Sequence, residues 1–62
     1  MPFIEVKMFE GRTPEQKEQL ILEITRVFEE VLGLRKDQVW ILIHDEPKEN
    51  WGLRGEQASK SK

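Results

Sequence analysis

The feature that most constrains the fold is one long amphipathic helix, which the sequence predicts over residues 14–32. Thr13 and Gln16 can form a capping box, and Pro14 suits the first helical position. Gly33 follows as the expected terminator. Seven apolar residues recur at helical spacing: Leu20, Ile21, Ile24, Val27, Phe28, Val31 and Leu32. A helix with one such stripe must pack on an apolar partner.

Two short apolar runs flank this helix and predict strands over residues 2–9 and 38–44. The first run alternates polar and apolar residues in part, whereas the second is apolar on both sides, because Trp40 and Leu42 alternate with aliphatic residues. Two strands joined by such a helix form a βαβ unit with parallel strands. One helix covers only one sheet face, so we expect further copies of the chain to cover the other.

The remaining residues predict a small C-terminal unit. Residues 45–50 have the composition of a polar turn, and residues 51–55 carry two glycines spaced as in a hairpin or bulge. We expect residues 57–62 to be a loose tail, or a short strand docked on a neighbour. The predicted fold class is α+β: one domain over residues 1–62, with a β-α-β protomer and a short hairpin.

Composition limits the functions that are open to this chain. Its 62 residues include no Cys and one His, which argues against disulfides and against a thiolate or histidine metal cluster. A chain this short is marginally stable alone, so self-association is the expected support. The net charge of −2, with both signs interspersed, favours neither nucleic acid nor a membrane as partner. Without a membrane span or signal layout, we expect a cytoplasmic protein.

The start of the chain, Met1-Pro2, offers one unusual chemical group. An initiator Met before a small residue such as Pro is removed during maturation, which would leave Pro2 with a free secondary amine. An α-amino group has a pKa of about 7.7–8.0, and an apolar pocket lowers it. A mature Pro2 could therefore act as a general base near neutral pH.

These pieces together resemble a known family. Met1-Pro2 leads directly into a strand, Glu10-Gly11-Arg12-Thr13 follows that strand, and Trp51-Gly52-Leu53-Arg54-Gly55-Glu56 closes the chain. Over nearly its whole length the chain resembles the 4-oxalocrotonate tautomerase family of the tautomerase superfamily. The resemblance implies a protomer that pairs into a four-stranded dimer sheet, and a homohexamer built as a trimer of dimers. It implies no metal or organic cofactor.

The resemblance also implies roles for individual residues. Pro2 matches the catalytic base, which moves a proton between an enol and its unsaturated ketone. Arg12 matches the arginine that binds the carboxylate of a small acid substrate, a task suited to a guanidinium. We expect its charge also to keep the Pro2 amine neutral. Trp51 matches the aromatic wall of the pocket, and Leu53 and Phe9 are further candidates for its lining.

Trp40 departs from the family, whose archetype has a second arginine at this place. Tryptophan offers one N–H donor and no positive charge, so it polarises a developing dienolate poorly. Trp40 either lines the pocket or fills an interface between subunits. We therefore expect a substrate less charged than a dicarboxylate such as 2-hydroxymuconate. Arg35 and Arg54 are the candidates to replace the missing charge.

Three functions follow, of which a tautomerase acting on a small unsaturated 2-oxo or 2-hydroxy acid is the leading one. A Pro2-dependent hydratase or dehalogenase of unsaturated acids is the second, and it needs a carboxylate to activate water. Glu10, Asp45 and Glu46 are the nearby candidates for that carboxylate. The third is a non-catalytic assembly subunit, or one half of a hetero-oligomer whose partner supplies the missing arginine. Trp40 in place of that arginine favours it, and so would retention of Met1, because the Pro2 nitrogen would then be an amide.

Overall fold

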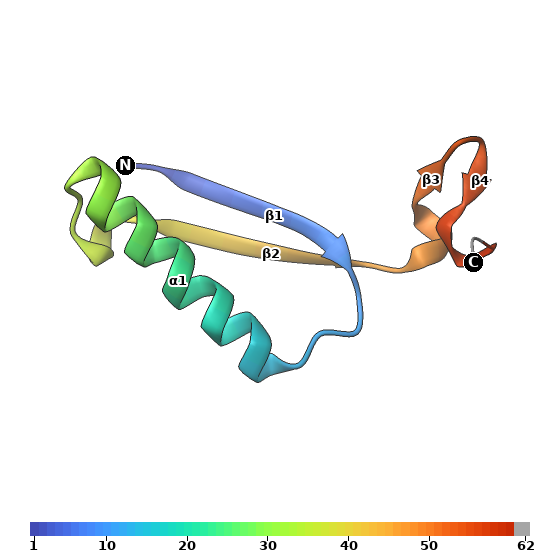
Figure 1. Cartoon of the computed structure of the whole chain (residues 1–62), viewed down its shortest axis with the longest axis horizontal. Helices are drawn as coiled ribbons and strands as arrows, with labels where there is room; N and C mark the ends of the chain where they lie inside the picture. The colour runs from blue at the N-terminus through green and yellow to red at the C-terminus, as the bar shows by residue number, and fades with distance from the viewer. Residues whose placement is uncertain (61–62) are drawn as a thin grey trace.

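The structure is a computed structural model that describes residues 1–60, and it contains one helix and two small sheets (Figure 1). In chain order the elements are β1 (Phe3–Phe9), α1 (Pro14–Leu32), β2 (Trp40–Glu46), β3 (Gly52–Leu53) and β4 (Glu56–Gln57). Single 3₁₀ turns cover Lys36–Gln38, Lys48–Asn50 and Ala58–Lys60. The predicted α+β class, with a β-α-β unit and a C-terminal hairpin, is confirmed.

β1 and β2 form a parallel pair in which Ile4 lies opposite Ile41 and Phe9 lies opposite Glu46. Helix α1 runs along one side of this pair (Figure 1), and on that side Ile4, Val6 and Met8 of β1 and Ile41 and Ile43 of β2 are half-buried. The other side, which we call the open face, is covered by no helix or sheet among residues 1–60. Its residues are Phe3, Glu5, Lys7 and Phe9 of β1 and Trp40, Leu42, His44 and Glu46 of β2.

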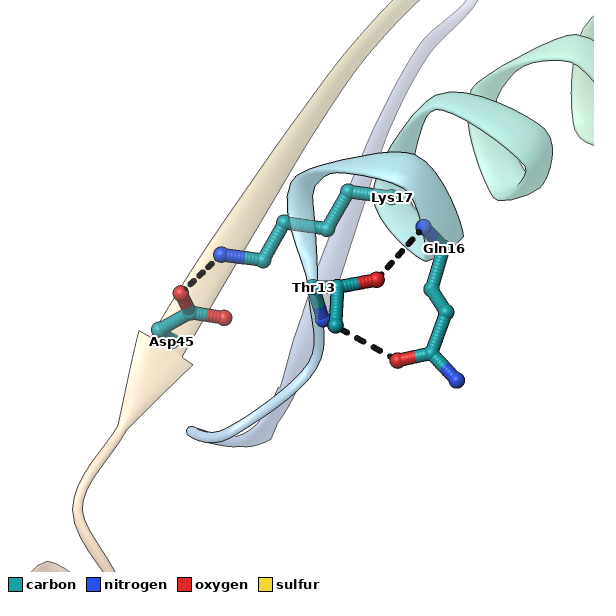
Figure 2. A network of polar contacts seen from close by, with 4 residues as sticks. All are labelled: Thr13, Gln16, Lys17 and Asp45. Carbon is teal, nitrogen blue, oxygen red and sulfur yellow. Dashed lines mark hydrogen bonds and ion pairs between the residues drawn. The ribbon is translucent and has the colours of Figure 1, made fainter.

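The start of α1 is held by the predicted capping box (Figure 2). The Gln16 backbone N–H donates to Thr13 Oγ1 at 3.1 Å, and the Thr13 N–H donates to Gln16 Oε1 at 3.0 Å. One turn later, Lys17 forms an ion pair with Asp45 of β2. Gly33 ends the helix with a φ of 67°, so the helix bounds are confirmed. The local sequence thus sets the helix, and one ion pair ties its start to the sheet.

Three predicted strand boundaries were wrong. The first strand begins at Phe3 rather than at Pro2. The second strand begins at Trp40 rather than at residue 38, because Gln38 closes a 3₁₀ turn in which its side-chain Oε1 accepts from the Arg35 N–H at 2.9 Å. The strand continues to Glu46, where it still pairs with β1.

The prediction of a loose tail was wrong for residues 57–60. Gln57 pairs with Gly52 in the β3–β4 hairpin, and the Ala58 N–H donates to the Trp51 carbonyl oxygen at 2.9 Å. Backbone hydrogen bonds therefore hold residues 57–60 in place. The small polar side chains of this segment gave no indication of those bonds in the sequence. Residues 61–62 of the predicted tail lie outside the described residues.

The single chain has almost no interior. No side chain among the described residues is fully buried, and large apolar residues are exposed on both the helix and the open face. The accessible surface is 5264 Å², compared with about 4,200 Å² for a compact protein of this mass. The radius of gyration is 14.7 Å, compared with about 10.6 Å for a compact chain of this length. The excess surface, about 1,000 Å², is of the order that one partner buries in a stable interface.

Candidate active site

Pro2 lies at one end of the sheet, beside two exposed aromatic residues. The Trp40 N–H donates to the Pro2 carbonyl oxygen at 3.2 Å, and Phe3 is the register partner of Trp40. Phe3 and Trp40 are on the open face and are 60% and 57% exposed. Trp40 thus lies next to Pro2 in its own chain. In this position it is available both to line a pocket at Pro2 and to contact a second subunit.

The other candidate residues lie at the opposite end of the sheet. Arg12 follows the end of β1, while Trp51 and Leu53 follow the end of β2. The rings of Phe9 and Trp51 pack edge to face, with centroids 5.2 Å apart and planes at 86°. Lys48 Nζ lies 5.6 Å from the centroid of the Phe9 ring. Phe9 and Trp51 therefore form one aromatic wall with a cation at its side.

One chain does not bring these two groups together. β1 has seven residues, which span about 23 Å from the Pro2 end to the Arg12 end. At that distance the charge of Arg12 has little effect on the amine of Pro2 in the same chain, contrary to the expectation from sequence. The residues can act on one substrate only if Pro2 and the aromatic wall come from different chains.

A cavity of about 220 Å³ opens beside the aromatic wall, lined by Lys7, Glu46, Asn50 and Trp51. Lys7 and Glu46 come from the open face, and Asn50 and Trp51 come from the turn after β2. The Trp51 Nε1 atom is enclosed and has no hydrogen-bond partner among residues 1–60. An enclosed donor without an acceptor is destabilising by about 1–3 kcal/mol, so this part of the chain is incomplete by itself.

Sequence reasoning missed Lys7 and Asn50 as site residues. The signal for Lys7 was available, because strand alternation places it on the same face as Phe9, two residues away. Asn50 gave no such signal, since it reaches the cavity only through the 3₁₀ turn at Lys48–Asn50. Glu46 was predicted only as a carboxylate for water activation, and it does line the cavity.

Several other candidate charges are already engaged. Asp45 is paired with Lys17, and the Arg35 Nε lies 3.1 Å from Asp37 Oδ1. On the open face, His44 Nε2 lies 2.8 Å from Glu5 Oε2. Residues 1–60 contain no group of three or more His, Cys, Asp or Glu side chains placed to hold a metal ion. None of their helices is long and apolar enough to cross a membrane.

Comparison with known proteins adds the family. The model of the family described as "Tautomerase enzyme" matches residues 2–61, beginning at Pro2. The chain belongs to the tautomerase family. Two similar relatives are the 2-hydroxymuconate tautomerases of Comamonas testosteroni, 45% identical, and of Pseudomonas putida, 38% identical. Each alignment covers 97% of this chain and 95% of the relative.

The solved structures agree with this membership. A 4-oxalocrotonate tautomerase isozyme from Methylibium petroleiphilum is 45% identical to this chain, with a TM-score of 0.88 and 94% of each chain covered. The resemblance to the 4-oxalocrotonate tautomerase family is therefore confirmed, and so is the β-α-β fold. Tautomerases are isomerases, so this chain belongs to an enzyme family, and tautomerase activity is its supported activity.

Proposed function

We propose that this tautomerase interconverts the enol and keto forms of a small unsaturated 2-oxo or 2-hydroxy acid, with the amine of Pro2 as general base and acid. The observation that carries the proposal is the family match, which starts at Pro2 and runs through residue 61. The 45% identical relative from Comamonas testosteroni is named a 2-hydroxymuconate tautomerase, which supports an unsaturated acid as substrate. The proposal requires that Met1 is removed during maturation. The proposed location of the enzyme is the cytoplasm.

The reaction is a proton shift without redox change. The neutral amine of Pro2 takes the proton of the enol hydroxyl, and the electron pair of that O–H bond becomes the carbonyl. The C=C π pair of the enol shifts along the conjugated chain, and the carbon at its end uses that pair to take the proton back from the ammonium, which restores the neutral amine. No metal or organic cofactor is needed for this step, because the base and the acid are the same nitrogen.

The active site of this proposal is shared between subunits. Within one chain Pro2 and the Phe9–Trp51 wall lie at opposite ends of β1, so a second copy must supply one of the two. The exposed open face and the missing interior support such an assembly. We propose that two protomers pair into a four-stranded sheet and that three dimers form a homohexamer; a hetero-oligomer would serve the same geometry.

In this assembly Arg12 holds the substrate carboxylate, and Trp51, Phe9 and Leu53 exclude water. Arg12 suits this role because it is in no ion pair among residues 1–60. Arg35 and Arg54 were the candidates to replace the family arginine whose position is taken by Trp40. Arg35 is paired with Asp37, and Arg54 lies at the tip of the β3–β4 hairpin. With Trp40 beside Pro2, a less charged acid than 2-hydroxymuconate is the proposed substrate.

The test is a comparison of four forms of the enzyme with phenylenolpyruvate and 2-hydroxymuconate as substrates. The mature protein, confirmed by intact mass to lack Met1, should tautomerise phenylenolpyruvate faster than it tautomerises 2-hydroxymuconate. A form with one residue added before Pro2 should lose at least about a hundredfold in rate, because its nitrogen becomes an amide. Pro2→Ala should also be severely slowed. Pro14→Ala, which changes a proline at the helix start, is the matched control and should keep full activity.

Equal rates with and without the added residue would refute Pro2 as the base. Complete inactivity of the mature protein alone would instead favour the assembly-subunit alternative. A hydratase or dehalogenase is the second candidate, since Glu46 lines the cavity while Asp45 is engaged by Lys17. Release of chloride from a 3-chloroacrylate, lost in Glu46→Gln but not in Asp45→Asn, would establish that activity.

A further inference from the structure

We propose that the cavity lined by Lys7, Glu46, Asn50 and Trp51 is a binding subsite for a small acid with a single negative charge. Lys7 and Asn50 act together with Arg12, which follows β1 at the same end of the sheet, in holding its carboxylate, and Glu46 excludes substrates with a second carboxylate at this end. The inference rests on the proposed function in taking the bound acid to be the substrate. It assigns roles to three residues that neither the family resemblance nor the comparisons mark.

Lys7 is the cation that the cavity can offer to a ligand. Among residues 1–60 Lys17, Arg26 and Arg35 are each in an ion pair, whereas Lys7 is in none. Its register partner His44 is already engaged with Glu5 at 2.8 Å. An ammonium that is not neutralised by the protein and lines a cavity attracts a carboxylate.

Glu46 limits the negative charge that a bound ligand can carry. It is the last residue of β2, opposite Phe9, and its carbonyl oxygen accepts from the Glu10 N–H at 3.0 Å, so its backbone is held in place. Glu46 is half-buried as a residue, and its carboxylate is in no ion pair among the described residues. A ligand with two carboxylates would place one of them beside Glu46. Repulsion between that carboxylate and the Glu46 carboxylate would weaken the affinity by about tenfold or more.

The rest of the cavity fits a short unsaturated chain. The volume of about 220 Å³ is below the range of about 300–1,000 Å³ that is typical of sites for drug-sized ligands. The Phe9–Trp51 wall supplies apolar contact for the carbon chain. Asn50 supplies an amide donor, and its backbone is fixed because its N–H donates to the Pro47 carbonyl oxygen at 2.9 Å.

The experiment uses two unreactive probes with the same four-carbon trans skeleton, crotonate with one carboxylate and fumarate with two. Dissociation constants are measured by calorimetry on the mature, assembled protein. The unmodified protein should bind crotonate about tenfold more tightly than fumarate. Lys7→Gln should weaken crotonate at least about tenfold, and Lys7→Arg should restore it. Glu46→Gln should tighten fumarate about tenfold and change crotonate by less than about threefold.

Arg26→Gln is the charge-matched control, since it also removes one positive charge but lies on α1, where Arg26 pairs with Glu23. It should leave both constants unchanged. Unaltered crotonate binding in Lys7→Gln, an unaltered preference in Glu46→Gln, or no saturable binding of either probe would overturn the proposal. Neither probe undergoes tautomerisation. The expected binding pattern in an enzyme without tautomerase activity would thus support the subsite while refuting the proposed function.

Discussion

Leu42 is the residue through which the covering of the open face can be tested most directly. It lies in the middle of β2 and is 46% exposed in the single chain, opposite Glu5. Leu42→Asp places a carboxylate across from the Glu5 carboxylate. In a lone chain this exposed pair would cost less than about 1 kcal/mol.

The cost is larger if a second copy covers the face. Burying the exposed half of a Leu side chain contributes about 1 kcal/mol per copy, or about 6 kcal/mol in a hexamer. An unpaired carboxylate enclosed in that interface adds several kcal/mol per copy. We therefore expect Leu42→Asp to dissociate the assembly at micromolar concentrations, while the unmodified protein stays assembled.

Analytical ultracentrifugation over a range of protein concentrations measures this effect. The control is Leu22→Asp, at a residue of similar exposure, 51%, that lies about 200° around α1 from the half-buried Ile24. This variant should sediment like the unmodified protein. A monomeric unmodified protein, or a Leu42→Asp variant that remains fully assembled, would refute burial of the open face.

Three further substitutions test the local structure, each by thermal unfolding at a fixed protein concentration. Thr13→Ala removes the helix cap and should destabilise by about 1 kcal/mol, a fall in Tm of about 4–8 °C; an unchanged Tm would show that the cap is dispensable. Arg54 has a φ of 56° in the hairpin turn beside Gly55, so Arg54→Gly should stabilise by about 0.5–1 kcal/mol, and a loss of stability would mean that the Arg54 side chain makes a stabilising contact. Lys17→Met breaks the partly exposed pair with Asp45 and should cost less than about 1 kcal/mol, whereas a loss above 2 kcal/mol would contradict a solvent-screened pair.

The elements with local signals were the ones that could be predicted. Thr13, Gln16 and Gly33 determine where α1 begins and ends through contacts within a few residues, and those bounds were correct. The start of β2 was misplaced because the side chain of Gln38 bonds to the Arg35 backbone, a competing local bond that hydrophobic patterning does not report. The hairpin after Trp51 was predicted from its glycines, while the turn over Ala58–Lys60 was not.

The candidate site divides in the same way. Pro2, Arg12 and Trp51 were predicted as site residues because their residue types and neighbours match a family pattern. Lys7 and Asn50 were not found, because a cavity depends on which side chains meet after the chain turns at residues 48–50. Lysine and asparagine are common residue types, so the sequence gives no reason to select these two. Only their position in the cavity lining identifies them as candidates.

The sequence by itself determined the order of elements and the parallel crossover. It also predicted a partner chain, since one apolar stripe cannot cover both faces of a sheet. The tertiary structure determined which residues lie close together in space. A strand keeps its two ends apart at a fixed rise per residue, so Pro2 and Arg12, ten positions apart in sequence, lie at opposite ends of β1. The same register brings Lys7 and Glu46, far apart in sequence, into one cavity wall. Sequence supplied the chemical groups, and strand geometry places Pro2 and the Phe9–Trp51 wall at opposite ends of β1 within one chain.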